Sequence, residues 1–304
     1  MDAAVRPEEP GLDLLVAGHT NIDHLLAVAS LPAPDRTVPI ERLDSVLGGT
    51  AATIARVAAR SGVRTGLVSR VGTDFPEAFA AALRRDGVDL SGLERVPDAR
   101  SPACYIADDG RGHQVAFMHQ GPMGDCRGAA VPEPLLASAR WLHLTTGDPR
   151  YQLALKRAAR RHGVRIAADP AQEVHYRWSG PELAELLVEA EILFGNESEL
   201  RRISALLGAP GPAGLLDRVP TVIMTRGARG VHAWTRAGTF SVPAPRLAGA
   251  HPVTGAGDAF RGGFYGEFFR GRPLEAALRA GTRTAAAWIR PAAARGRSGR
   301  RTPP

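Results

Sequence analysis

Near the end of the chain, a carboxylate lies in a glycine-rich turn that opens a helix: Gly255, Ala256, Gly257 and Asp258 follow one another. The first N–H groups of a helix have no intrahelical acceptors, so together with the helix dipole they attract an anion. A carboxylate repels a phosphate there, but it can act as a base toward a hydroxyl that receives a phosphoryl group. A plain helix start capped by an aspartate is the alternative, and the residues alone leave both open.

The helix that follows carries an unusual stripe of small residues. Ala259, Gly262, Gly263 and Gly266 fall at i, i+3, i+4 and i+7, so they share one face. A glycine in a helix interior costs roughly 1 kcal/mol relative to alanine. Three of them on one face predict that another element approaches that face closely.

These residues resemble a known family. The run Gly255–Asp258 is similar to the second signature of the ribokinase-like (PfkB) carbohydrate and nucleoside kinases, and residues 48–55 (GGTAATIA) are similar to the first signature. The resemblance implies that the N–H groups of Gly255, Ala256 and Gly257 form an anion hole. It also implies that Asp258 is the catalytic base. Three further runs, residues 143–149, 169–172 and 194–199, resemble the archaeal-type nucleoside kinases of this family in order and spacing.

The resemblance also places the acceptor sugar. It implies that Asn21 and Asp23, which we expect at the end of the first strand, bind sugar hydroxyls, as a carboxylate suits a vicinal diol. An Asx-type turn is the structural alternative for these two residues. Gly48 and Gly49 would bring backbone N–H groups to the sugar, and Thr53 stands where the family commonly has asparagine, so that contact is lost or altered.

The nucleotide and metal contacts follow from the same resemblance. Glu199 ends the run Asn196-Glu197-Ser198-Glu199 and is expected to hold Mg²⁺ through water. The alternative is an ordinary helix start, in which Asn196 is the N-cap and the acids occupy the first turn. The expected nucleotide-binding residues are Asn196, Thr225, Arg226, Gly227, Gly230 and Thr254. Either Arg226 or Arg229 could face a phosphate. Pro252 replaces an acidic ligand that helps bind a monovalent cation in many family members, so we expect only weak K⁺ dependence.

Several elements must position these residues. The expected strands are 12–18, 65–71, 141–145, 165–169, 191–194 and 221–225, and the expected helices between them are 49–61, 76–86, 151–162, 181–188 and 197–207. This alternation predicts a parallel sheet covered by helices on both faces, with ligands at the carboxyl ends of the strands. The resemblance implies a ribokinase-like three-layer α/β/α fold with a mostly parallel central sheet and a small β-lid. The lid segments would be 37–47 and 102–120, with a hairpin turn at residues 108–110.

The composition argues against several other classes of protein, such as nucleic-acid-binding proteins, membrane proteins and Walker-A or protein kinases. The net charge is +7, but five arginines and no acid lie within residues 290–304, so we favour a solvated tail over a nucleic-acid arm. Lys156 is the only lysine and lies in no phosphate-binding loop, which excludes Walker-A and protein-kinase chemistry. Apolar runs are too short to span a membrane. Cys104 and Cys126 lack metal-ligand spacing, so we expect reduced thiols in a cytoplasmic protein.

We therefore expect a kinase domain over residues 12–290, with flexible termini at 1–11 and 291–304, that uses ATP and Mg²⁺. It would phosphorylate a primary hydroxyl, best matched by the 5′-hydroxyl of a ribonucleoside. A sugar kinase of the same family is the first alternative. A non-catalytic sugar- or nucleotide-binding regulator is the second. The expected partners are a small sugar or nucleoside and ATP, with a homodimer formed through the lid and with neither a membrane nor a nucleic acid.

Overall fold

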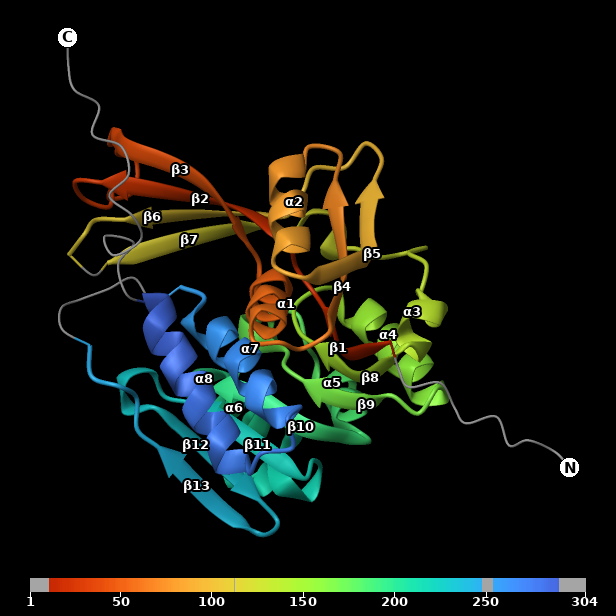
Figure 1. Ribbon diagram of the computed structural model, residues 1–304. Helices are drawn as coiled ribbons and strands as arrows, with labels where there is room; N and C mark the ends of the chain where they lie inside the picture. The colour runs from red at the N-terminus through yellow and green to blue at the C-terminus, as the bar shows by residue number, and fades with distance from the viewer. Residues whose placement is uncertain (1–10, 112, 248–253, 290–304) are drawn as a thin grey trace, which may run out of the picture.

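Short apolar strands alternate with amphipathic helices and assemble into a large sheet with a second, smaller sheet beside it (Figure 1). The computed structural model describes residues 11–111, 113–247 and 254–289. The expectations for residues 1–10, for Pro252 and for residues 290–304 lie outside these ranges.

The described residues of the large sheet form nine strands in the order β13-β12-β11-β10-β9-β8-β1-β4-β5. The parallel strands are β1 (Leu12–Ala17), β4 (Thr65–Gly72), β5 (Val88–Val96), β8 (Ala139–Leu144), β9 (Arg165–Ala168), β10 (Ala190–Asn196) and β11 (Thr221–Thr225). Two antiparallel strands, β12 (Val231–Thr235) and β13 (Gly238–Val242), extend one edge. The expected strands are confirmed.

Helices cover both faces of this sheet, which confirms the three-layer α/β/α prediction (Figure 1). One face carries α3 (Glu133–Ala137), α4 (Pro149–Arg161), α5 (Gly180–Leu187) and α6 (Glu197–Leu207). The other carries α1 (Thr50–Arg60), α2 (Glu77–Arg85), α7 (Ala256–Phe268) and α8 (Leu274–Ile289). Short 3₁₀ turns connect several elements: η1 (Gly121–Met123), η2 (Ala171–His175), η3 (Pro212–Asp217) and η4 (Gly227–Arg229).

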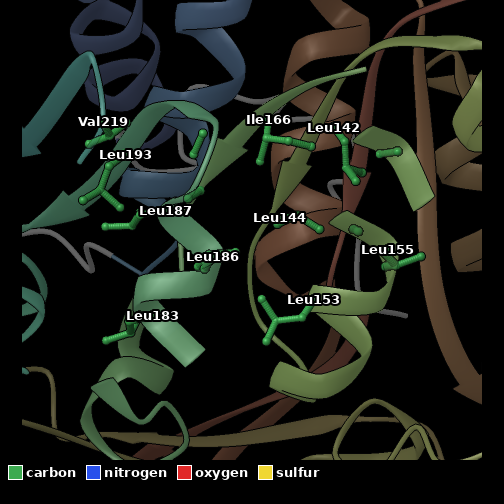
Figure 2. Packing of buried hydrophobic residues seen from close by; sticks show 14 of the residues in the cluster. Leu142, Leu144, Leu153, Leu155, Ile166, Leu183, Leu186, Leu187, Leu193 and Val219 are labelled. Atoms are coloured by element: carbon green, nitrogen blue, oxygen red, sulfur yellow. The ribbon is translucent and has the colours of Figure 1, made fainter. Parts of the chain in front are cut away.

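The strands contribute alternate side chains to two separate cores. Leu142 and Leu144 of β8 pack with α4 and α5 on one face, as Figure 2 shows, whereas Trp141 belongs to the core on the other face. Successive side chains of a strand point to opposite faces, so a strand covered on both sides contributes to both cores. Leu14 and Leu15 of β1 are divided between the two cores in the same way.

The small sheet has the order β3-β2-β6-β7 and projects from the large sheet (Figure 1). Its strands are β2 (Asn21–Val28), β3 (Ile40–Gly48), β6 (Ala103–Asp108) and β7 (Gln114–His119). Residues 37–47 and 102–120 were expected to be β-like, and they supply three of the four strands. The prediction that Asn21 and Asp23 end the first strand is wrong, because β1 ends at Ala17 and both residues begin β2.

The glycine face of α7 lies against two other helices, as the sequence predicted. A side-chain carbon at Gly262 would lie 2.5 Å from Cβ of Val57 and 2.9 Å from the carbonyl oxygen of Ile54 in α1. At Gly263 it would lie 2.3 Å from Oγ1 of Thr284 in α8. Close packing of the three helices therefore fixes where α7 begins.

No helix within the described ranges is long and apolar enough to cross a bilayer. Cys104 and Cys126 are both free, as expected, and Cys126 is buried.

Replacing Gly262 by alanine should destabilise the protein. The added methyl group meets α1 backbone as well as a side chain, so α1 and α7 must move apart, which costs about 1–3 kcal/mol. Helix propensity alone predicts the opposite sign, a gain of up to about 1 kcal/mol. Urea unfolding of Gly262→Ala and the parent protein measures the difference, and an equal or higher free energy of unfolding would contradict the close packing.

Candidate active site

The motif residues converge on one edge of the large sheet, where the parallel strands end. Asp169 follows β9 directly, Asn196 is the last residue of β10, and Thr225 is the last residue of β11. Strands β9, β10 and β11 are neighbours. Ligands of open parallel sheets bind at this carboxyl edge.

The glycine-rich turn opens α7, as expected. Gly255 is the N-cap and has a left-handed backbone with φ of +76°, a conformation that favours glycine. Trp288 of α8 donates its Nε1–H to the carbonyl oxygen of Thr254 at 3.2 Å, which holds the turn against α8. The N–H groups of Gly255, Ala256 and Gly257 therefore belong to a fixed helix start that can bind an anion.

Asp258 and Arg261 lie one turn apart on α7, with 4.0 Å between Oδ1 and Nη1. Arg261 is buried and also contacts Asp169, whose Oδ1 accepts a hydrogen bond of 2.7 Å from Nη2, while Nε lies against Oδ2. A buried charge is costly unless it is paired and hydrogen-bonded. Asp169 therefore supplies the main countercharge, and Asp258 is a second carboxylate at longer range.

The network continues into the core through His143. Its Nε2 lies 3.3 Å from Oδ2 of Asp169, and its Nδ1 lies 2.8 Å from the hydroxyl of Tyr265. Burial lowers the pKa of His143, so the ring is neutral at pH 7. This chain of partners holds Asp169 in place, and Asp169 in turn fixes the guanidinium of Arg261.

The surroundings of Asp258 suit a general base. Burial raises its pKa to about 7, although Arg261 opposes the rise, and the nearby carboxylates of Asp169, Glu199 and Asp23 add to it. Its side chain keeps 20% of its surface exposed within the described structure, so a substrate can reach it. A base with a pKa near the working pH combines ionisation with proton affinity, which favours proton transfer.

Two sequence motifs meet in one place. One supplies Asn21 and Asp23, and the other supplies Gly48 and Gly49. Asn21 pairs with Gly48 in the small sheet, and a side-chain carbon at Gly48 would lie 1.9 Å from Oδ2 of Asp23. At Gly49, the N-cap of α1, it would lie 2.5 Å from the carbonyl oxygen of His19. Glycine is therefore required at both positions for the segment from His19 to Asp23 to pass.

Two polar atoms of this group are buried without a hydrogen bond to any described residue: Oδ1 of Asn21 and Oδ1 of Asp23. Burial raises the pKa of Asp23 to about 6. Such atoms are costly unless a ligand or water pairs with them. Thr53 is also buried, in the first turn of α1, so this position lies next to the two glycines.

Asn196 and Glu199 form a capping box at the start of α6. Oδ1 of Asn196 accepts the N–H of Glu199 at 2.9 Å, and Oε2 of Glu199 accepts the N–H of Asn196 at 2.7 Å. The cap expected as an alternative is thus present. No group of three or more metal-ligating side chains occurs among the described residues. A lone carboxylate suits Mg²⁺ held through its own waters, because Mg²⁺ gives up water reluctantly.

The turn from Thr225 to Gly230 connects β11 to the antiparallel β12. Gly227 and Gly230 both have positive φ, and a side-chain carbon at Gly230 would lie 2.1 Å from the carbonyl oxygen of Val242. The two arginines already have protein partners: Arg226 donates to Oγ of Ser241 at 3.2 Å, and Arg229 is paired with Glu197. A phosphate would therefore compete with these partners for either side chain.

Sequence reasoning missed Arg261, His143 and Tyr265 as parts of the site. A signal was present, because Arg261 is the only charged residue between Asp258 and Glu267 in a helix otherwise rich in glycine and aromatic residues. A charge on a buried helix implies a buried partner. That partner, Asp169, is 92 positions away in the sequence, so local patterns did not indicate it.

Comparison with known proteins supplies independent evidence. Residues 12–296 match the model of the pfkB family carbohydrate kinases. A nucleoside kinase of Methanothermobacter thermautotrophicus is 33% identical over 86% of this chain and 84% of its own. A cytidine kinase of Thermococcus kodakarensis is 32% identical over 89% of this chain and 93% of its own. The crystal structure of a Methanocaldococcus jannaschii nucleoside kinase superposes with a TM-score of 0.80 at 26% identity, covering 92% of each chain.

Removing the guanidinium of Arg261 should cost much stability. Arg261→Leu leaves Asp169 buried without its main countercharge, for which we expect a loss of about 3–5 kcal/mol in the free energy of unfolding. Arg157→Leu is the matched control, because it breaks an exposed pair with Glu185 that is worth at most about 1 kcal/mol. Urea unfolding compares the two variants, and similar losses for both would contradict the role of Arg261 as the buried countercharge.

Proposed function

The chain belongs to the pfkB carbohydrate kinase family and is an ATP-dependent carbohydrate or nucleoside kinase; from this premise we propose that it phosphorylates the 5′-hydroxyl of a ribonucleoside. The observation that carries the proposal is the position of Asp258, with a pKa of about 7, beside the free N–H groups that open α7. Relatives that are 32% and 33% identical are named as nucleoside or cytidine kinases, which supports a nucleoside as acceptor.

The transfer follows from these positions. Asp258 accepts the proton as the O–H bond of the acceptor breaks and its oxygen forms a bond to the γ-phosphorus of ATP. The bond between that phosphorus and the bridging oxygen of ADP breaks, and the electron pair leaves with ADP. The N–H groups of Gly255, Ala256 and Gly257 stabilise charge on the transferring group. Arg261 stays paired with Asp169, which keeps the guanidinium from binding the phosphate in place of the helix start.

In this proposal the acceptor and the nucleotide bind at different parts of the site. Asn21 and Asp23 pair their buried oxygens with sugar hydroxyls, and Gly48 leaves room for the Asp23 carboxylate. The nucleotide lies along the carboxyl edge near Asn196, Thr225, Arg226, Gly227, Gly230 and Thr254. Glu199 has one oxygen outside the capping box and would hold Mg²⁺ through water, where the ion offsets phosphate charge.

We also propose that residues 12–290 form one kinase domain in which the small sheet is the lid. Asp23 lies against Gly48, and its carboxylate is near enough to Asp258 to contribute to the raised pKa of that base. Closure of this sheet over the acceptor would exclude water and protect ATP from hydrolysis.

The opposite face of the small sheet supports a homodimer. Strand register places five exposed apolar side chains there, away from Asp23: Ile40, Leu43, Tyr105, Val115 and Phe117, which together form the outer face of the lid. Phe117 is 66% exposed and Leu43 58%. Exposed apolar patches of this kind mark association sites, and a second copy would bury both outer faces against each other.

The base assignment is tested by Asp258→Asn. The variant keeps the shape of the side chain but cannot take up the proton, and general base catalysis is worth roughly 10²–10⁴ in rate. We expect kcat with a nucleoside acceptor to fall by that factor, while the affinity for ATP changes little. Coupled detection of ADP gives kcat, and near-parental turnover by the variant would rule out Asp258 as the base.

The dimer is tested by charging the outer face of the lid. Leu43→Glu combined with Phe117→Glu should convert a dimer into a monomer, because two buried carboxylates per subunit oppose the contact. Val188→Glu is the control, since Val188 is also exposed, at 57%, but lies at the end of α5. Light scattering after gel filtration gives the mass. A monomeric parent protein, or a double variant that remains dimeric, would refute this interface.

A further inference from the structure

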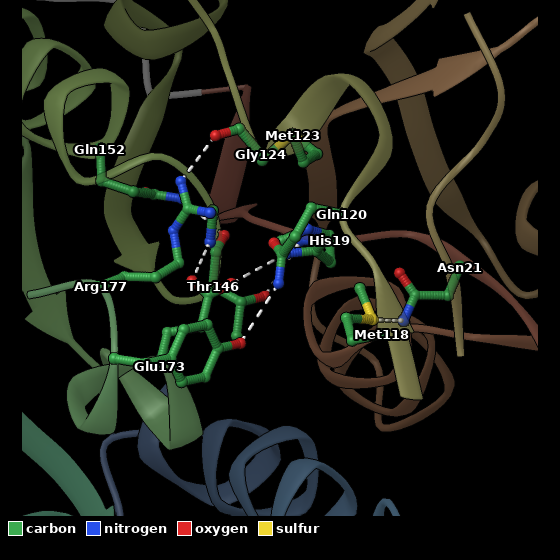
Figure 3. Close-up of polar contacts among 12 residues, drawn as sticks. His19, Asn21, Met118, Gln120, Met123, Gly124, Thr146, Gln152, Glu173 and Arg177 are labelled. Atoms are coloured by element: carbon green, nitrogen blue, oxygen red, sulfur yellow. Dashed lines mark hydrogen bonds and ion pairs between the residues drawn. The ribbon is translucent and has the colours of Figure 1, made fainter. Parts of the chain in front are cut away.

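A group of buried and half-buried polar side chains next to the lid takes no part in the transfer described above. Its members are His19, Gln120, Gln152, Glu173 and Arg177, which come from the loop after β1, the end of the lid, α4, η2 and the residues after η2. Figure 3 shows them gathered around Thr146, whose Oγ1 accepts the N–H of His19 at 3.2 Å. Buried polar groups of a folded protein are normally paired with one another or with a ligand.

His19 is the least satisfied member. It is 2% exposed, and neither ring nitrogen makes a hydrogen bond to a described residue, although the carbonyl groups of Gln120 approach the ring. Burial lowers its pKa to about 4, so at pH 7 the ring is neutral and offers one donor and one acceptor. Its Nδ1 lies 3.9 Å from Oε1 of Glu173, beyond hydrogen-bond distance.

The neighbours of His19 also have unused hydrogen-bonding atoms. Glu173 accepts the N–H of Gly147 with Oε2 at 2.5 Å, and burial raises its pKa to about 7. Gln120 donates from Nε2 to the hydroxyl of Tyr176 at 3.2 Å, but its Oε1 is unpaired among the described residues. Nε of Arg177 and Oε1 of Gln152 are likewise buried without a described partner. The group thus presents both donors and acceptors.

The position of this group relative to the acceptor site follows from the strands. Asp23 interacts electrostatically with Asp258, and Asn21 lies two residues back on the same face of β2. The amide of Asn21 contacts Sδ of Met118 at 3.8 Å, and Gln120 follows Met118 by two residues. These relations connect Asp258 through Asp23 and Asn21 to Met118 and Gln120. An acceptor whose 5′-hydroxyl meets Asp258 directs its C1′ substituent toward this group.

We propose that His19, Gln120 and Glu173 bind the base of the nucleoside, and that they select a base with an amide edge, an N–H beside a C=O. This inference rests on the proposed function, because it assigns the far end of the same acceptor. The carboxyl of Glu173 and Oε1 of Gln120 accept the ring N–H, and the ring N–H of His19 donates to the carbonyl oxygen.

The lid gives the base access to this group. Gln120 directly follows the last strand of the small sheet, so opening of the lid withdraws it from His19 and Glu173. Closure then brings Gln120 onto the bound base. Base selection and closure over the sugar therefore depend on the same movement.

The test compares two nucleosides that differ only at this edge: inosine, which has the amide edge, and purine riboside, which lacks it. The variants are Glu173→Gln and Gln120→Leu in the full chain, and Glu185→Gln on the exposed side of α5 is the control. The measured quantity is kcat/KM for each nucleoside at saturating ATP. The parent should prefer inosine by roughly tenfold or more, the worth of one or two hydrogen bonds. Each variant should reduce that ratio to within about twofold of one, and the control should keep the parental ratio.

The outcomes separate the two proposals. If the parent phosphorylates no nucleoside, the proposed function fails. If it phosphorylates nucleosides but shows no preference for inosine, or if both variants keep the parental ratio, the base assignment is overturned while the kinase assignment stands. The ratio is unaffected by a general loss of active protein, so partial misfolding of a variant does not imitate the expected result.

Discussion

The burial of one guanidinium among carboxylates is the interaction on which the site depends. Arg261 lies in an apolar helix and is held by Asp169. Asp169 is held in turn by His143, whose other ring nitrogen contacts the hydroxyl of Tyr265. Carboxylates without this positive charge would repel one another and take up protons at neutral pH. With it, Asp169 stays ionised: its pKa is lowered despite burial, since Arg261 opposes the effect of burial. Asp258, at 4.0 Å from the same guanidinium, is left with a pKa of about 7.

Helix packing makes that arrangement possible. The glycine face of α7 allows α1 and α8 to approach within contact distance of its backbone, which fixes the start of α7 at the carboxyl edge of the sheet. The same principle acts at Gly48 and Gly49, where the absence of side chains lets the segment from His19 to Asp23 pass. Both glycine motifs therefore serve close approach of backbone, one placing the base and the other placing the residues that face the sugar.

Much of this could be predicted from the sequence, since the strands and helices of the large sheet have strong local signals. The alternation of short strands and helices indicated the parallel sheet, and the small residues at i, i+3, i+4 and i+7 indicated the contact of α7. The strand β2 was missed because Asn21–Val28 mixes polar and apolar residues without clear alternation, in keeping with a strand whose side chains are half-buried on both faces. The Arg261–Asp169 pair and the group around His19 were missed because contacts between distant segments make them, and such contacts leave no local pattern.

The central claim is that ionised Asp258 accepts the proton of the acceptor hydroxyl. The most direct measurement is kcat/KM for a nucleoside between pH 5.5 and 8.5, for the parent and for Asp258→Asn. The base must be ionised, and its pKa is raised to about 7, so parental activity should be full above that pH and fall tenfold per unit well below it. The residual activity of Asp258→Asn should lose the limb centred near pH 7 and keep only the decline that protonation of Asp23 causes around pH 6. A parental profile that is flat through pH 7, or an unchanged limb centred near pH 7 in Asp258→Asn, would contradict the account.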